Sequence, residues 1–200
     1  MAASFVLLGM PMAAIGVAWP SAADELGRSL ADLGLVTFAY GAGYTLSTLA
    51  NGELTRRFTA GPLLVVAAFA ASLSLAAFAL SSNWALFLGA GFTLGLAGGV
   101  LDSGVNAYVA VHRGARAMGV VHTGFGIGST LGPLFVTALL ALGASWRVAF
   151  GSLAMADLLL AIAFLATISA IEGTIGSTGR RPSVGGNRVV LGLSVAVFFL

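Results

Sequence analysis

The chain contains no cysteine and no lysine, and it has few charged residues of any kind. The absence of cysteine excludes disulfides, Cys-ligated metal sites and thiol catalysis within these 200 residues. Only 8% of the residues are charged, whereas a soluble domain carries roughly a quarter. Nine basic and seven acidic side chains are too few to cover the surface of a globule of this length. The sequence therefore predicts a protein embedded in lipid.

Hydrophobic residues make up 58% of the chain, and its mean hydropathy is +1.02. A helix needs roughly 20 apolar residues to cross a hydrocarbon core about 30 Å thick. Six segments meet or approach that length, at residues 4–20, 33–54, 61–80, 84–111, 117–142 and 147–171. We therefore expect an all-α membrane protein with a six-helix transmembrane bundle over residues 1–171.

A flexible segment and a further apolar run follow the predicted bundle. Residues 172–188 are rich in Gly, Ser and Arg, which predicts a cytoplasmic linker. The run at 189–200 begins at Val189 and is still apolar at Leu200, so it is predicted to be the start of a seventh helix. A half-spanning helix leaves backbone groups unpaired in lipid. We therefore expect a longer parent chain whose carboxyl-terminal half is a partner of this bundle.

The distribution of arginine predicts the orientation. With a cytoplasmic amino terminus, only Arg28 and Arg147 fall outside, and the other arginines fall inside, at positions 56, 57, 113, 116, 180, 181 and 188. Basic residues favour the cytoplasmic side of a membrane. We expect a multi-pass protein of the cell inner membrane, with the amino terminus and linker cytoplasmic. The arginines form no nucleic-acid patch, so no nucleic-acid partner is expected.

Asp102 is the strongest candidate for a functional group within a predicted span. Gly98, Asp102 and Asn106 are four residues apart, so they share one helix face. An aspartate near the middle of a membrane costs several kcal/mol unless it is paired, protonated or facing water. It is either a structural group that hydrogen-bonds a neighbouring helix or a solute- or proton-binding group. The second alternative is favoured.

Four other side chains are secondary candidates. Asp157, in the sixth predicted helix, serves either helix pairing or proton coupling. His122 is either a packing residue or a proton-linked one. Tyr40 and Tyr44 lie one turn apart and either pack or present hydroxyls to a cavity. The tryptophans at the predicted outer helix ends are expected to lie at the membrane interface and to carry no chemistry.

Several motifs together resemble the amino-terminal half of a major facilitator superfamily transporter. The short-looped helices are followed by a long linker, and Ser145-Trp146-Arg147 opens the sixth. The fourth and fifth helices carry glycine ladders, at positions 91, 95 and 99 and at 124, 128 and 132 before Pro133. The resemblance implies two inverted three-helix repeats in this half and a solute site near the midplane between two halves.

Two further motifs refine the resemblance. The loop Gly52-Glu53-Leu54-Thr55-Arg56-Arg57-Phe58-Thr59 keeps Gly52, Leu54 and Arg57 of the superfamily's gating loop and lacks its acidic residue and second glycine. The acidic residue four before an Asn on the fourth helix is similar to the fucose-permease-like branch, which implies that Asp102 contacts solute. The helix-five Asn of that branch aligns with Thr123, and its helix-one Asp aligns with Gly16.

The resemblance implies secondary active transport of a small, sugar-like or other polar solute by alternating access, with proton coupling. Asp102, Asn106, Thr123, Tyr44 and Tyr40 would contact the solute. No enzyme activity, cofactor or metal is expected.

Three alternatives remain. The segment at 128–133 is typical of exporters of drugs or other amphipathic compounds. Ser103 and His122 are the only candidates for an intramembrane serine protease. A non-transporting membrane protein is the last alternative.

Overall fold

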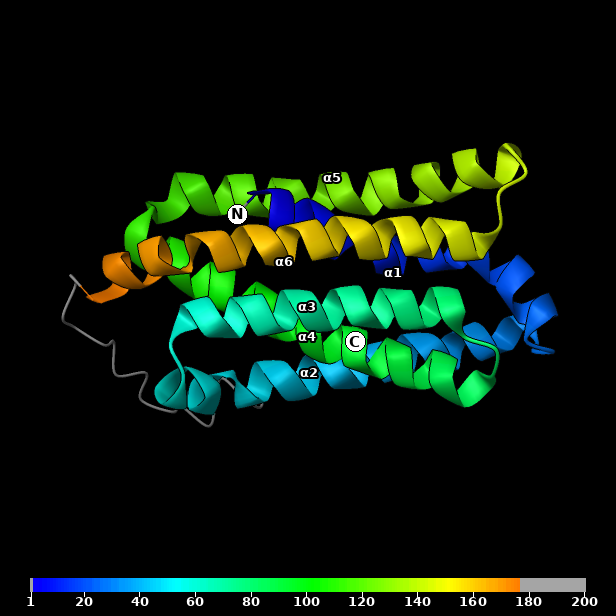
Figure 1. Ribbon diagram of the computed structural model, residues 1–200, viewed down its shortest axis with the longest axis horizontal. Coiled ribbons are helices and arrows are strands. Elements are labelled where there is room, and N and C mark those ends of the chain that lie inside the picture. The colour runs from blue at the N-terminus through cyan, green and yellow to red at the C-terminus, as the bar shows by residue number, and fades with distance from the viewer. Residues whose placement is uncertain (1, 177–200) are drawn as a thin grey trace.

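The computed structural model describes residues 2–176, and within that range the chain consists of six α-helices and one 3-10 turn (Figure 1). The elements are α1 (Ala2–Glu25), η1 (Leu30–Asp32), α2 (Leu33–Arg57), α3 (Ala60–Leu80), α4 (Trp84–His112), α5 (Gly114–Ala141) and α6 (Trp146–Gly176). This arrangement confirms the all-α fold and the six predicted helices. Residues 172–176, which the sequence assigned to the linker, continue α6. The rest of the linker and the seventh helix lie outside the described residues.

The helix ends follow local chemistry. The side chain of Asn83 caps α4 by accepting a hydrogen bond from the amide of Leu86 at 2.9 Å. Gly114, the first residue of α5, has φ of +72°, and Gly143, which follows α5, has φ of +81°. This left-handed conformation is available to glycine without steric cost, so each marks a sharp reversal of the chain. The reversals set consecutive helices antiparallel.

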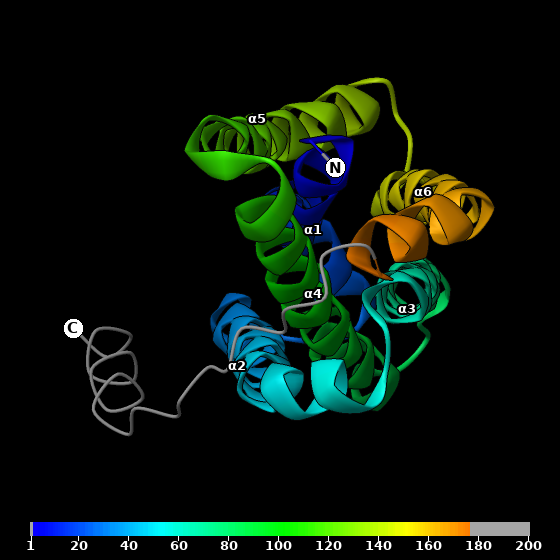
Figure 2. The same cartoon turned by 90° about the vertical axis from the view of Figure 1, so that its left-hand side faces the viewer.

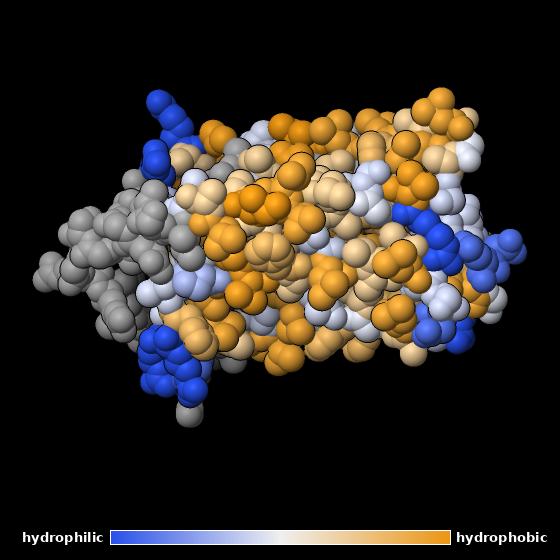
Figure 3. All heavy atoms as spheres, in the orientation of Figure 1, coloured by the Kyte–Doolittle hydropathy of each residue, from blue (hydrophilic) through white to orange (hydrophobic). Residues whose placement is uncertain are grey.

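Five of the six helices are long and apolar enough to cross a membrane. The exception is α2, which has the length but not the hydropathy, because hydroxyl, amide and glycine residues dilute its apolar content. Figure 3 shows a broad apolar band around the middle of the bundle, with hydrophilic residues towards both ends. This pattern matches a body that lies in a bilayer. The low hydropathy of α2 marks it as the helix with the most polar contacts to make.

The helices pack in three principal pairs, α1 with α5, α2 with α4 and α3 with α6. If α1, α2 and α3 are exchanged with α4, α5 and α6, in that order, the α1–α5 pair becomes the α4–α2 pair. The α3–α6 pair is unchanged by the same exchange. The contact pattern therefore has the symmetry expected of two related three-helix repeats. In the end-on view of Figure 2, α4 crosses the bundle between α2, α3 and α1.

Glycine brings the backbones of two of these pairs into direct contact. A Cβ added to Gly95 of α4 would collide with the backbone of Tyr40 and Tyr44 on α2. A Cβ added to Gly128 of α5 would collide with the backbone of Val6 on α1. Small residues at such positions are what allows helices to approach closely in a membrane. The glycine ladders predicted from sequence are thus packing faces, one for each pair.

One end of the bundle, where α1 ends and α6 begins, is held by aromatic and charged contacts. Trp19 and Trp146 lie near these helix ends and are only 2% exposed, so their indoles pack against neighbouring helices. The Trp146 indole donates to Glu25 at 2.6 Å, and Arg147 pairs with Glu25 at 3.1 Å. Arg147 also donates to the carbonyls of Ala79 and Ser81. Burial of the indoles is possible because their N–H groups find acceptors inside the protein.

Candidate functional site

A cluster of polar side chains lies where α2 packs against α4. The Tyr44 hydroxyl donates to Asp102 Oδ2 at 2.6 Å, and the Asn106 amide donates to Asp102 Oδ1 at 3.0 Å. Both donors are neutral, and none of the ion pairs among the described residues involves Asp102. Two of the predicted solute ligands, Tyr44 and Asn106, are therefore gathered directly around the carboxyl group of Asp102.

The packing register explains why these residues meet. Gly91, Gly95 and Gly99 of α4 face Val36, Tyr40 and Tyr44 of α2 in turn, so one helical turn on α2 matches one turn on α4. The cluster begins one turn beyond the last of these glycines. Because the backbones are close at the glycines, the tyrosine side chain of one helix can reach the carboxyl group of the other. The glycine ladder thus positions the polar cluster.

Two amide oxygens near the cluster are buried without a partner in the described part of the chain. They are Oδ1 of Asn106 and Oδ1 of Asn51. Since Nδ2 of Asn106 donates to a carboxylate oxygen, the orientation of that amide is fixed by its bond. Two turns beyond the Tyr44–Gly99 contact, the same register places Asn51 of α2 at the level of Asn106. Buried acceptors of this kind normally have a donor, so both oxygens are available to a bound molecule or water.

Tyr40 extends the cluster towards the centre of the bundle. Its ring stacks on that of Tyr44, with centroids 6.2 Å apart and an angle of 28° between the planes. Its hydroxyl lies close to Gly98, where an added Cβ would be 3.2 Å away. Tyr40 therefore joins Tyr44 and Asp102 through ring packing, and the glycine on the Asp102 face provides the space for its hydroxyl.

Asp157 lies apart from this cluster, inside the bundle. It is 5% exposed and, among the described residues, has no hydrogen-bond or ion-pair partner. It lines a small cavity of about 10 Å³ together with Tyr40 and residues of α1, α3 and α4. The structure thus gives the two intramembrane carboxyl groups different surroundings, one hydrogen-bonded at a helix pair and one facing a cavity.

Thr123 makes no hydrogen bond to the Asp102 cluster among the described residues. Its hydroxyl donates to the carbonyl of Gly119 in its own helix at 2.9 Å. The residue is exposed and lines a wide, shallow depression along α5 with Gly126, Ile127, Thr130 and Leu131. Within the described residues it makes no contact with Asp102 that would place both around one solute. Any shared role would require a solute that spans α4 and α5.

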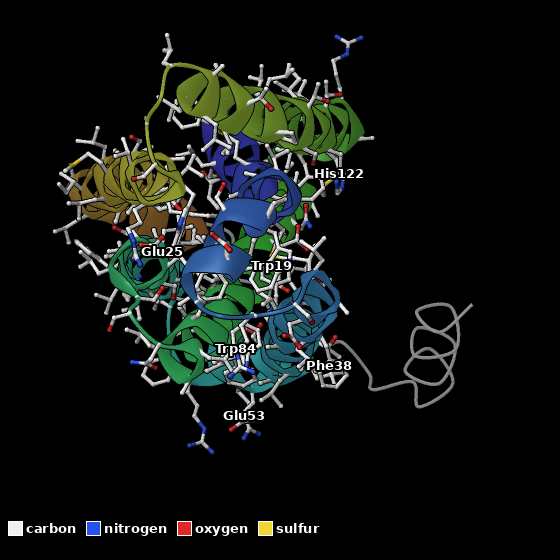
Figure 4. All side chains as sticks on the ribbon, turned by 90° about the vertical axis from the view of Figure 1, so that its right-hand side faces the viewer. Trp19, Glu25, Phe38, Glu53, Trp84 and His122 are labelled. Carbon is white, nitrogen blue, oxygen red and sulfur yellow. The ribbon has the colours of Figure 1, made fainter. Side chains whose placement is uncertain are left out.

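His122 and Ser103 do not form a catalytic pair in the described structure. The His122 ring packs edge-on against Phe5 of α1, with centroids 5.9 Å apart, and Figure 4 shows it towards the edge of the bundle. No hydrogen bond joins it to Ser103 among the described side chains, and nucleophilic catalysis needs such a bond between nucleophile and base.

The predicted gating loop is the last turn of α2. Gly52, Leu54 and Arg57 all belong to the helix, which ends at Arg57. Glu53 pairs with Arg56 at 2.7 Å and also with Arg57. Exposed pairs of this spacing contribute little to stability. The motif therefore contains its own ion pairs, in which Glu53 supplies the carboxylate. Glu53 is not at the position where the superfamily pattern has its acidic residue.

Sequence reasoning missed two features of the site. The first is Asn51, whose signal is its place on the tyrosine-bearing face of α2, seven residues after Tyr44. The second is the role of Glu25, which binds Trp146 and Arg147 where α1 ends and α6 begins. Figure 4 shows Trp19 near the middle of the bundle and Glu25 to one side of it, next to α3 and α6, with Phe38 and Glu53 at the edge. In the sequence, a charged residue at a helix end does not by itself indicate that it will bind side chains of another helix.

The chain was compared with known proteins. The model of the Major Facilitator Superfamily matches residues 1–200, which is the whole chain. No curated protein matches it.

Proposed function

The chain belongs to the Major Facilitator Superfamily, whose members are membrane transporters, and we propose that it forms the amino-terminal half of a secondary active transporter for a small polar solute. The solute would bind at the α2–α4 cluster, and the protein would work by alternating access against a carboxyl-terminal half of the parent chain. It would lie in the cell inner membrane, with the amino terminus and linker on the cytoplasmic side. The observation that carries the proposal is the neutral-donor environment of Asp102.

The cluster favours solutes that donate hydrogen bonds. Asp102 has two donors for its two oxygens, and further lone pairs remain on them. Asn106 and Asn51 each contribute a buried oxygen with no partner in the described residues. An unmet buried acceptor costs roughly 1 to 3 kcal/mol, which a solute donor would recover. Hydroxyl-rich solutes such as monosaccharides and polyols are therefore the expected class, with amino alcohols next.

An exporter of amphipathic compounds is the second candidate, supported by the depression along α5. It is lined by two threonines, a glycine and two large apolar residues, at positions 123, 126, 127, 130 and 131. That mixture suits a ligand with both polar and apolar parts. Transport direction separates the two candidates, because an exporter would accumulate its compound in everted vesicles.

The test uses the full-length parent protein in proteoliposomes with a panel of radiolabelled monosaccharides, polyols and amino alcohols. Asp102→Asn keeps the size of the side chain and removes its charge. We expect uptake to fall roughly tenfold to a hundredfold, as for loss of hydrogen bonds to a charged group. The matched control is Ser152→Ala, an exposed α6 residue that bonds only its own helix at 2.8 Å. Unchanged uptake with unchanged pH dependence in Asp102→Asn would remove Asp102 from the mechanism.

A further inference from the structure

The cavity beside Asp157 lies among five helices in the interior of the bundle. Its wall includes four residues of α1: Ser4, Leu7, Leu8 and Pro11. The other lining residues come from α2, α3, α4 and α6, at positions 40, 71, 94, 98, 101 and 157. Its volume of about 10 Å³ is the room that one water molecule needs. Tyr40 is the member of the solute cluster that lines it, whereas Asp102, Tyr44 and Asn106 do not. The bundle thus contains a second polar position.

Three of the residues that line this cavity carry a side-chain oxygen: Ser4, Tyr40 and Asp157. A water molecule there would have the two to four polar partners that buried waters normally have. A hard metal cation would need about six oxygen ligands, and the remaining wall is apolar or glycine. Tyr40 is the only other titratable group among the lining residues; α1, α3 and α4 contribute none. The cavity therefore suits water and a proton better than a metal ion.

The surroundings of Asp157 favour a group that gains and loses a proton. An ionised carboxyl without a partner in an apolar interior costs several kcal/mol. A carboxyl that holds a proton is neutral and can donate to the adjacent water. Ionisable residues placed this way inside membranes commonly mark proton pathways. The absence of a partner among the described residues makes Asp157 different from Asp102, which has two donors.

We infer that Asp157, with Tyr40 and one water molecule, forms the binding site for a coupling proton, separate from the solute site at Asp102. In the loading step a hydronium ion in the cavity gives its proton to the Asp157 carboxylate, which leaves a carboxylic acid and a water molecule. In the release step the acid returns the proton to water on the other side. This inference rests on the proposed function, because a coupling proton requires a transported solute.

A packed contact joins the two sites. Tyr40 lines the Asp157 cavity and stacks on Tyr44, and Tyr44 donates to Asp102 at 2.6 Å. A solute that binds Asp102 beside the Tyr44 hydroxyl would shift the carboxyl group and the hydroxyl bonded to it, and so move the stacked tyrosine pair and change the position of Tyr40 in the cavity wall. Coupling between sites needs such a shared element with more than one arrangement. The tyrosine pair is the shared element here.

The first experiment tests proton binding without any solute. The full-length protein in lipid is titrated while infrared difference spectra follow the carbonyl stretch of protonated carboxyl groups in H₂O and D₂O. We expect a titrating band that disappears in Asp157→Asn and persists in Asp102→Asn. Asp157→Glu keeps a carboxyl group and should shift the band without removing it. If no band depends on residue 157 in folded protein, the inference is overturned.

The second experiment tests coupling with the solute that the uptake panel identifies. Asp157→Asn should abolish solute-driven acidification of the vesicle lumen while solute exchange continues at a reduced rate. For a neutral solute at about 100 mV, concentrative uptake should fall roughly fifty-fold, the loss expected for one uncarried charge. Asp157→Glu should restore part of the coupling, and Ser152→Ala serves again as the control.

The two proposals fail in different ways. If no solute of the panel is transported by the wild-type protein, the proposed function fails, whereas the infrared titration still decides whether Asp157 binds a proton. If a solute is transported and Asp157→Asn retains full gradient-driven accumulation, the proton site is refuted and the transport function stands. If Asp157→Asn neither folds nor exchanges solute, Asp157→Glu decides the matter. A folded Asp157→Glu protein that carries the titrating band would support the proton site at residue 157.

Discussion

The α2–α4 pair and the α1–α5 pair are equivalent positions of the two three-helix repeats, but only the first carries a polar cluster. Both pairs have backbone contact at glycine, through Gly95 in one and Gly128 in the other. In the α2–α4 pair the contact continues into Asp102 and its two donors. In the α1–α5 pair the nearest hydroxyl, that of Ser129, donates to the carbonyl of Phe125 in its own helix.

The difference between the two pairs distinguishes the glycine contacts, which serve helix packing, from the polar contacts, to which we assign the function. Glycine sets the distance between two helices in both pairs, so close approach is a property of the fold. The α2–α4 pair has a side-chain hydrogen bond from one helix to the other, between Tyr44 and Asp102, and it is the pair where solute binding is proposed. Replacing a contact glycine should therefore lower the unfolding free energy in either pair. Removing a hydroxyl group should lower solute affinity in the α2–α4 pair and leave it unchanged in the α1–α5 pair.

The largest effect is expected for Gly95→Ala. The added Cβ would lie 2.9 Å from the Tyr40 carbonyl carbon and 2.9 Å from the Tyr44 amide nitrogen, so the helices must separate. Overpacking of this kind costs roughly 3 kcal/mol of unfolding free energy. Gly89→Ala, on the same helix with nothing within 4 Å, should gain up to about 1 kcal/mol instead. Equal stability of the two variants in denaturant titration of the full-length protein would contradict the backbone contact.

Gly128→Ala should destabilise the protein nearly as much but leave the solute affinity of the folded fraction unchanged. Its Cβ would lie 3.0 Å from Val6 Cα and closer to the Val6 carbonyl, which affects α1 and not the Asp102 cluster. The control is Gly119→Ala, also on α5 and with nothing within 4 Å. Unfolding free energy and solute affinity are measured on the same preparation. A loss of affinity in Gly128→Ala beyond that of Gly119→Ala would show that the two pairs are not independent.

The sequence predicted the helices and the glycine faces well because both depend on local composition and spacing. Runs of apolar residues and four-residue glycine spacing are visible without knowledge of partners. Asp102 and Asn106 share a face by the same spacing, so their association was predictable too. Tyr44 as a partner of Asp102 was a hypothesis, and the contact depends on the register between α2 and α4, which no single segment encodes.

Other features depended on contacts between distant segments and were not predictable. The hydroxyl of Thr123 donates to the carbonyl of Gly119 in its own helix, and whether α5 brings it to the same solute as Asp102 depends on packing between helices that no single segment encodes. The burial of Trp19 and Trp146 among helices was not predicted, because it depends on Leu30 and Glu25 supplying acceptors for their indoles. Residues 172–176 continue α6, although the Gly, Ser and Arg content of 172–188 predicted a linker from residue 172.

An intermediate effect is expected for Tyr44→Phe, which removes one hydroxyl from the α2–α4 pair. The bond to Asp102 is 2.6 Å long and orients the carboxyl group. Losing a hydrogen bond to a charged group costs about 1.5 kcal/mol or more, which corresponds to roughly tenfold weaker solute affinity. The ring remains stacked on Tyr40, so the packing of the two helices should be retained. Affinity equal to wild type in equilibrium binding would mean that the hydroxyl does not position Asp102.

The smallest effect is expected for Ser129→Ala, which removes a hydroxyl from the α1–α5 pair. This hydroxyl lies near Gly9 of α1 but donates to the Phe125 carbonyl of its own helix at 2.9 Å. That carbonyl keeps its helical environment after the substitution, and hydrogen bonds within membranes contribute about 0.6 kcal/mol on average. Unfolding free energy should therefore change by less than about 0.6 kcal/mol and solute affinity not at all. A tenfold loss of affinity, matching Tyr44→Phe, would mean that α1–α5 also contacts the solute, and the functional difference between the two repeats would then disappear.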